Sequence, residues 1–145
     1  MTVYTGTIAK YNAWLDNMVE SANLSSDTFK IGLVTSTYTF SASHSTISDI
    51  TNEVSGSGYA RQTLSSVTSS QTSGTYTFDF ADPVFTASGG SIVARRWFIF
   101  DDTPTSPADP LCFSGLINNA DADVTVTDGN TLTFNVNASG LFTIA

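Results

Sequence analysis

Most of the chain alternates apolar and polar residues with a period of two, and this pattern restricts its fold more than any other feature. The alternation is clear where Tyr76, Phe78 and Phe80 are separated by Thr77 and Asp79. A period of two places successive side chains on opposite faces of a strand. Glycine-rich or proline-rich breaks separate the alternating segments, at residues 55–58, 88–90, 103–107 and 128–130.

These segments predict about eight or nine short strands. Short strands that do not alternate with helices are typical of an antiparallel β-sandwich or barrel, so we expect a mainly β protein. The polar residues 65–74 are predicted to form a long hairpin loop between strands. The expected strands are residues 29–33, 46–54, 62–67, 75–80, 92–101, 111–117, 124–126, 132–136 and 141–144.

One segment near the N-terminus has helical spacing instead. Thr7 is a suitable N-cap, and the pattern predicts one N-terminal amphipathic helix over residues 8–22, with Trp14 beside its apolar stripe. The helix is expected to lie on the sheet of its own domain or against a partner subunit. The stripe consists of Ile8, Tyr11, Leu15, Met18, Val19 and Ala22, and the opposite face includes Lys10, Asn12, Asp16, Asn17 and Glu20.

The length of 145 residues fits one domain, residues 1–145. We expect an extended N-terminal arm over residues 1–7, then the helix over 8–22, and a β-sandwich over 28–145.

The charge balance and the length of the apolar stretches exclude two classes of partner. The chain has five basic and 13 acidic residues and a net charge of −8, with no basic run that could neutralise phosphates, so we expect no nucleic acid partner. The longest strongly apolar stretch, Trp97 to Phe100, is much shorter than the roughly 20 residues of a membrane span, so we expect no membrane partner. The N-terminus does not resemble a secretion signal.

The reactive side chains do not form a pattern typical of an enzyme, and we expect no catalytic residues, cofactor or metal. His44 is the only histidine and falls in a polar loop. Cys112, the only cysteine, falls in an apolar run and is expected to be a small buried residue of a protein made in a reducing cytoplasm. The spacing of Asp121, Asp123 and Asp128 does not match a calcium loop and is typical of turns.

Two further motifs have structural explanations. Asp101 and Asp102 are adjacent, so in a strand they would point to opposite faces and not into one cleft. Gly56 and Gly58 precede Tyr59 without the lysine and helix of a phosphate loop. We expect these glycines to supply positive φ angles at a tight corner, which lets Tyr59 fold back onto the sheet.

Several segments, in order along the chain, together resemble one family. They are residues 26–34 (SDTFKIGLV) after the helix, 47–60 (ISDITNEVSGSGYA), 82–92 (DPVFTASGGSI), 98–103 (FIFDDT), 110–111 (PL), 128–129 (DG) and 140–144 (GLFTI). In this order they resemble small tailed-bacteriophage virion proteins that are encoded with the capsid genes.

The resemblance implies a virion structural protein, and above all a head decoration (cement) protein on the outer capsid surface. It implies synthesis in the host cytoplasm, the major capsid protein as partner, and self-association, with a homotrimer expected. Arg95 and Arg96 depart from the family pattern; they would either contact acidic capsid groups or lie solvated at the start of a strand. Val3 and Tyr4 are apolar anchors in the arm, and we expect them to contribute to a capsid or trimer contact.

Two other functions remain open. The first alternative is a carbohydrate-binding or adhesion module of a tail or fibre. Trp14 and Trp97 would be its stacking residues, although both fall on apolar stripes. An enzyme, such as a cell-wall hydrolase, is the third and least supported possibility because no acid, base and nucleophile fall into a recognisable arrangement.

Overall fold

The computed structural model describes residues 2–3, 7–20 and 22–144, with the side chains of 7–15, 17–18 and 22–144. The protein is mainly β, as predicted, and the described residues form thirteen strands, more than the eight or nine expected. A central five-stranded antiparallel sheet has the order β2 (Ala9–Lys10), β10 (Leu111–Leu116), β9 (Arg96–Asp101), β3 (Phe29–Val34) and β4 (Gln62–Thr63).

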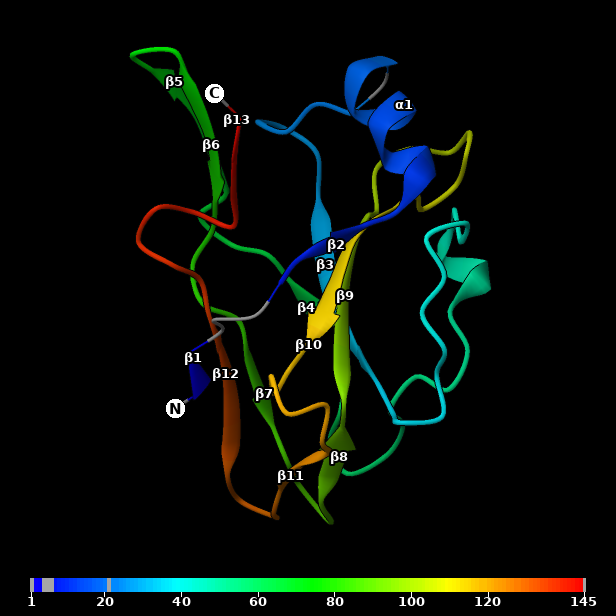
Figure 1. The fold of residues 1–145 in the computed structure, drawn as a ribbon. Coiled ribbons are helices and arrows are strands. Elements are labelled where there is room, and N and C mark those ends of the chain that lie inside the picture. Colours follow the sequence, from blue (N-terminus) through cyan, green and yellow to red (C-terminus); the bar gives the residue numbers. More distant parts are fainter. Residues whose placement is uncertain (1, 4–6, 21, 145) are drawn as a thin grey trace.

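The second layer is an interrupted sheet made of two three-stranded parts (Figure 1). The first part is β5 (Thr68–Thr72), β6 (Thr75–Asp79) and β13 (Phe142–Ile144); the second is β7 (Val84–Thr86), β12 (Thr131–Asn135) and β1 (Thr2–Val3). Short linkers connect β6 to β7 and β12 to β13. Strand β6 pairs antiparallel with β13, and β7 pairs antiparallel with β12. A small antiparallel pair, β8 (Ile92–Ala94) and β11 (Val124–Val126), completes the described strands.

Aromatic contacts join the two layers into a sandwich. The ring centroids lie 5.3 Å apart for Phe29 and Phe78, 5.0 Å for Trp97 and Phe134, and 5.1 Å for Phe113 and Phe142. Each pair joins a strand of the central sheet to a strand of the interrupted sheet, and such tilted or edge-on pairs stabilise a core beyond the area that they bury. The prediction was an antiparallel sandwich or barrel, and its mainly β, antiparallel class is confirmed, with β1, parallel to β12, as an exception.

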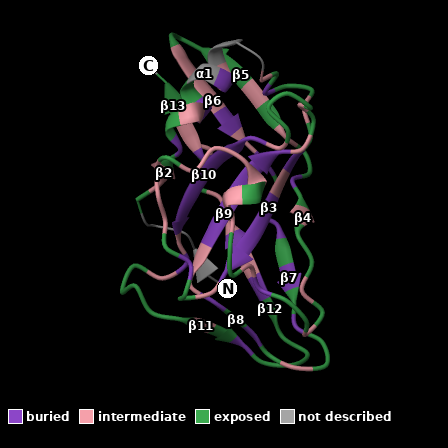
Figure 2. Cartoon of the chain, turned by 90° about the vertical axis from the view of Figure 1, so that its right-hand side faces the viewer, coloured by how far each residue is buried: buried purple, intermediate pink, exposed green. Residues whose placement is uncertain are grey.

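The three inner strands of the central sheet, β10, β9 and β3, are buried on both faces, which explains why they are so apolar. Trp97 and Ile99 belong to the core between the layers, as the predicted alternation requires. Phe98 and Phe100 face a second, smaller core, which is completed by residues from the segment after β3, including Tyr38 and the partly buried Phe40, Ile47 and Ile50. Figure 2 shows the buried residues concentrated along β3, β9 and β10.

The helix differs from the prediction. Helix α1 spans Asn12–Glu20, not residues 8–22, because Ala9 and Lys10 pair with β10 as a strand and Thr7 therefore lies too early to cap it. The buried face also differs: Trp14 is 1% exposed and Asn17 is buried, whereas Leu15 on the predicted apolar stripe is 43% exposed. Pairing of the preceding strand thus shortens the helix and changes which of its residues are buried.

Three predictions, of two strands and one loop, were also wrong in detail. Residues 46–54 contain a short 3-10 helix, η1 (Ile47–Asp49), and cover the second core. The predicted loop 65–74 contains β5, which pairs with β6 through a tight turn at Ser73 and Gly74, where both φ angles are positive. Arg95 interrupts the predicted strand 92–101, because its backbone bonds to Val34 and Ile117 instead of continuing the pairing of β8.

Candidate binding groove

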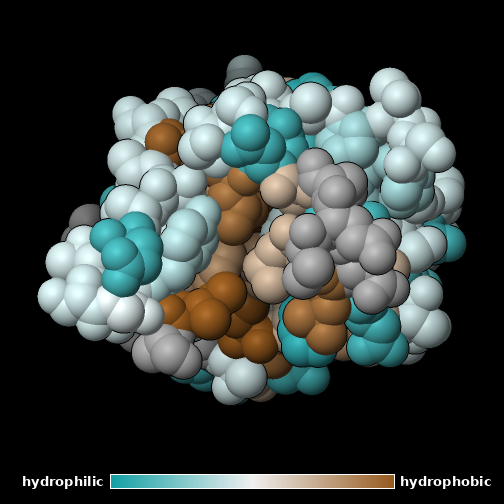
Figure 3. Space-filling model, turned by 90° about the horizontal axis from the view of Figure 1, so that it is seen from above, coloured by the Kyte–Doolittle hydropathy of each residue, from teal (hydrophilic) through white to brown (hydrophobic). Residues whose placement is uncertain are grey.

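An apolar groove of about 370 Å³ lies between helix α1 and strand β13, at the end of the sandwich. Figure 3 shows hydrophobic atoms gathered in a hollow on this face. We call it the α1–β13 groove; it is lined by Ile8, Lys10, Trp14, Leu15, Met18, Phe113, Phe142 and Ile144. Its volume and apolar lining with one charged group are typical of binding sites.

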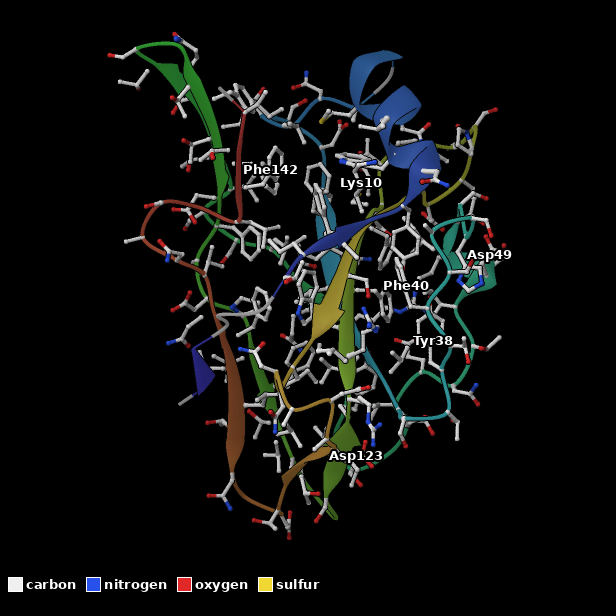
Figure 4. The ribbon with its side chains drawn as sticks, viewed as in Figure 1. Lys10, Tyr38, Phe40, Asp49, Asp123 and Phe142 are labelled. Carbon is white, nitrogen blue, oxygen red and sulfur yellow. The ribbon has the colours of Figure 1, made fainter. Side chains whose placement is uncertain are left out.

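Two sheet edges bound this groove. Strand β2, which carries Lys10, is one of the two edge strands of the described central sheet. Strand β13, which carries Phe142 and Ile144, is an edge strand of its three-stranded sheet. Figure 1 shows β13 between β6 and α1, and Figure 4 shows Lys10 and Phe142 at the same end of the molecule. An outer strand has backbone N–H and C=O groups that are not used by its own sheet.

The rims of the groove are exposed and apolar. Leu15 on α1 is 43% exposed and Ile144 on β13 is 47% exposed. Beyond Met18 and Ile144 the surface continues into a second hollow of about 480 Å³, which is more polar and includes Ser25, Ser69 and Tyr76. Neighbouring exposed apolar side chains around a concave surface indicate a contact site more often than isolated ones do.

Lys10 is the charged group of the groove. It is exposed and forms no ion pair with any side chain that the structure describes. Lys10 was predicted on the polar face of a helix, so the helical spacing gave no indication of this site. The site depends on β2 and β13 coming together in space, and no local pattern shows that.

Arg95 and Arg96, predicted as interaction residues, both have partners within the chain. The Arg95 guanidinium lies 2.8 Å from an Asp123 carboxylate oxygen and 3.7 Å from one of Asp121. Arg96 donates to the Ser114 hydroxyl at 3.4 Å and lies 5.0 Å from the centre of the Phe40 ring. Asp123 lies far from Lys10 (Figure 4), so Arg95, which is paired with Asp123, and the groove are separate features. A capsid contact through Arg95 or Arg96 stays a prediction.

The N-terminal arm is partly held by the protein itself. The backbone of β1 pairs in parallel with β12, with Thr2 opposite Phe134 and Val3 opposite Asn135. Tyr4, the second predicted anchor, lies outside the described residues. The backbone of Thr2 and Val3 therefore has a place in the fold, while the predicted contact of Val3 and Tyr4 with a partner stays a prediction.

The glycine corner before Tyr59 is structural, as predicted. Gly56 and Gly58 both have a φ of 72°. The Tyr59 hydroxyl accepts a hydrogen bond from the Leu33 N–H at 2.9 Å and donates to Glu53 at 2.8 Å. Arg61 binds the same carboxylate through two nitrogens, at 2.8 and 2.7 Å. Burial raises the pKa of Tyr59, so the phenol stays protonated and acts as a lock between this corner and β3.

His44 belongs to a row of hydrogen-bonded rings. Its Nδ1 lies 2.9 Å from the Tyr38 hydroxyl, which lies 3.3 Å from the Tyr11 hydroxyl. Burial raises the pKa of both tyrosines, so neither is activated as a phenolate nucleophile. The nearby Asp49 accepts the N–H groups of Ser45 and Thr46, which lowers its pKa. These contacts connect the segment after β3 to the sheet that it covers.

Asp101 is a fully buried carboxyl group at the end of β9. One oxygen, Oδ1, accepts the Thr103 N–H at 3.0 Å, while Oδ2 has no hydrogen-bond partner in the part of the chain that the structure describes. Burial, and to a lesser extent the negative charge of Asp27, raise the pKa of Asp101 to about 6, although the Thr103 N–H acts in the opposite direction. The adjacent Asp102 instead forms an ion pair with Lys30 at 2.7 Å, so the two acids do not share one site.

The remaining candidate residues have structural positions. Cys112 is completely buried, as predicted, and burial raises the pKa of its thiol well above the ordinary value. The Asp128 carboxylate accepts the Gly89 N–H at 2.8 Å. Among the described residues, no group of three or more His, Cys, Asp or Glu side chains is placed to hold a metal ion, and no helix is long and apolar enough to cross a membrane.

Both tryptophans are buried. Trp14 is 1% and Trp97 is 0% exposed, so neither presents a ring face for stacking on a sugar. The Trp14 indole N–H also lacks a hydrogen-bond partner among the described residues. A cavity of about 10 Å³ beside Trp97 has room for at most one water molecule and is too small for a ligand. Comparison of the chain with protein-family models, with curated proteins and with solved structures finds no match.

Proposed function

We propose that this protein is a structural component of a tailed-bacteriophage virion, which binds the outer surface of the head and stabilises the shell. The observation that carries the proposal is the α1–β13 groove, an exposed apolar surface beside two sheet edges, because such a surface suits binding to another subunit. The order of the family-like segments along the chain supports the virion assignment.

The chemistry of the described side chains agrees with a binding role. Several polar groups that an enzyme could use are tied into the fold: Tyr59 joins β3 to a corner, and Asp49 holds the backbone ahead of η1. The partners we propose are the major capsid protein and further copies of this chain, as a homotrimer, since closed symmetry gives each subunit the same contacts.

The test is the copy number of the protein on purified mature heads, measured by quantitative mass spectrometry and located by electron cryo-microscopy. Decoration of the shell requires hundreds of copies, on the order of one per capsomer or per three-fold position. About a dozen copies or fewer would assign the protein to the tail or portal region, and complete absence from particles would refute a virion role.

The sugar-binding alternative predicts a different result. Because Trp14 and Trp97 are buried, this function would have to use other side chains. Titration of the isolated protein against cell-surface glycans, followed by its intrinsic fluorescence, separates the two functions; saturable glycan binding would favour an adhesion module.

A further inference from the structure

We infer that the α1–β13 groove binds an extended peptide segment of another virion protein, one that carries a carboxylate on the same face as its apolar side chains. The inference rests on the proposed assembly function and adds the chemistry of the partner. Three properties of the groove carry it: its size, its free strand edge and its unpaired cation.

The size of the groove favours a short segment over a whole subunit face. Its volume of about 370 Å³ falls within the range of about 300–1,000 Å³ for small ligand sites. A stable subunit interface buries about 800 Å² on each partner, far more surface than a groove of this size presents. A few side chains from one segment therefore fit this groove better than the packed face of a second copy.

The edge of β13 favours a peptide over a small amphiphile. Among the strands that the structure describes, β13 pairs with β6 alone, in the order β13-β6-β5. In an antiparallel pair alternate residues direct their N–H and C=O groups away from the partner strand, where a further strand can bond to them. An added strand of this kind obtains affinity from the backbone and specificity from alternate side chains. Phe142 and Ile144 line the groove beside this edge, two residues apart on one face.

The charges favour a carboxylate on the segment. Three of the other basic side chains are in ion pairs: Lys30 with Asp102, Arg61 with Glu53, and Arg95 with Asp121 and Asp123. Arg96 lies against Phe40 and Ser114.

Lys10 is different, because its ammonium group has no ion pair among the side chains that the structure describes. In a chain of net charge −8, this free cation at the edge of an apolar groove is the place where a carboxylate would be attracted.

The alternation of side chains along an extended strand determines which residues of the bound segment would face the groove. In an extended strand every second side chain points to the same face, so two apolar residues and an acidic residue at positions i, i+2 and i+4 would enter the groove and reach Lys10. A suitable probe is the fluorescein-labelled peptide Ser-Leu-Thr-Phe-Thr-Glu-Ser with a blocked C-terminus. Its matched control has Gln in place of Glu.

The test is a titration of both peptides with the full chain, followed by fluorescence anisotropy. We expect saturable binding, with the Glu peptide about threefold to fivefold tighter than the Gln peptide, which is the effect of one partly exposed ion pair. In Lys10→Met this preference should disappear, whereas Lys10→Arg should keep it. Lys30→Met is the matched control, because Lys30 lies on the same sheet but is paired with Asp102, and its preference should equal that of the wild type.

Three results would overturn the inference: failure of both peptides to bind, equal binding of the two peptides to the wild type, or a preference that persists in Lys10→Met. Binding of dodecanoate without binding of either peptide would also overturn it, because a small amphiphile would then be the occupant. Thermal unfolding of each variant verifies that the fold is intact.

The particle experiment separates this inference from the proposed function. If heads carry many copies of the wild type and equally many of Lys10→Met, with unchanged affinity, the protein decorates heads but the groove does not recognise a carboxylate there. If the peptides bind as expected and the protein is absent from heads, the groove chemistry stands and the virion assignment fails.

Discussion

Replacement of the buried Asp101 by asparagine should stabilise the protein at neutral pH, although it changes a residue in the core. The side chain is 0% exposed, and its Oδ2 has no hydrogen-bond partner among the described residues. Ionisation of this group is therefore unfavourable in the folded state, and the pKa rises to about 6 because of burial and the neighbouring Asp27. In the unfolded chain an Asp has a pKa of about 3.9.

The sign of the pH effect follows from proton binding. Between about pH 4 and pH 6 the folded state binds more protons at Asp101 than the unfolded state does, so the contribution of this residue to stability falls as the pH rises through this window. A difference of about two pKa units corresponds to about 2 to 3 kcal/mol. The full penalty is present at pH 7 and above, and little of it remains near pH 4.

The asparagine side chain of the Asp101→Asn variant should avoid this penalty because it has no charge to bury. Its amide oxygen can still accept the Thr103 N–H, and its NH₂ group can donate toward the Asp27 carboxylate. The free energy of unfolding of Asp101→Asn should exceed that of the wild type by about 2 to 3 kcal/mol at pH 7.5 and differ little at pH 4. The difference between the two proteins cancels the titration of the acids that do not interact with Asp101, because both proteins share them.

Urea unfolding from pH 4 to pH 8, followed by the fluorescence of the buried Trp14 and Trp97, measures this difference. Asp102→Asn is the matched control: Asp102 is partly exposed and paired with Lys30, so its loss should change stability by less than about 1 kcal/mol. A difference between Asp101→Asn and the wild type that stays constant over this pH range would refute the reasoning.

Three further changes test the packing and the lock. Gly32→Ala should lower the free energy of unfolding by about 1 to 3 kcal/mol in chemical denaturation, because an added Cβ would overlap the Phe98 ring. Gly129→Ala has open space around the added Cβ but a φ of 80°, so backbone strain alone should cost about 1 to 2 kcal/mol; a loss for Gly32→Ala well below that of Gly129→Ala would contradict the steric explanation. Tyr59→Phe should cost about 1 to 2 kcal/mol in the same assay, because the Leu33 N–H loses its acceptor; no loss would mean that water replaces the phenol. Arg95→Ala should cost less than about 1 kcal/mol, and less again in 1 M salt, because its ion pairs are partly exposed; an effect independent of salt would argue against them.

The fold class could be predicted from the sequence because the alternation of Trp97 and Ile99 with Phe98 and Phe100 reports local geometry. The failures occurred where a long-range contact changes the local preference. Residues 9–10 join β10 instead of the helix, and residues 68–72 form a strand although they are polar, because they pair with β6 in a hairpin that needs few buried side chains. A local pattern cannot show which distant strand is available for pairing.

The candidate groove could not be predicted for the same reason. Its lining comes from the segment around β2 and α1, from β10 and from β13, so residues 8–18 meet residue 113 and residues 142–144. Leu15 was correctly identified as apolar, but its exposure depends on where Ala9 and Lys10 fix the start of the helix. Lys10 has no ion pair among the described side chains because of which acidic groups lie near it, and that is known only in three dimensions.

The segments that resemble phage virion proteins serve mainly the frame of this fold. Glu53, Gly58 and Tyr59 form the corner lock, and the backbones of Ser57 and Ser88 are joined by a hydrogen bond of 2.9 Å, which connects two of these segments. Most of the groove, by contrast, comes from the segment around α1, outside them. Residues that hold the backbone in place limit which fold the chain can adopt, whereas exposed side chains such as Lys10 limit which partner it can bind. The resemblance is therefore an argument about architecture, and the choice of partner has to be tested at the groove.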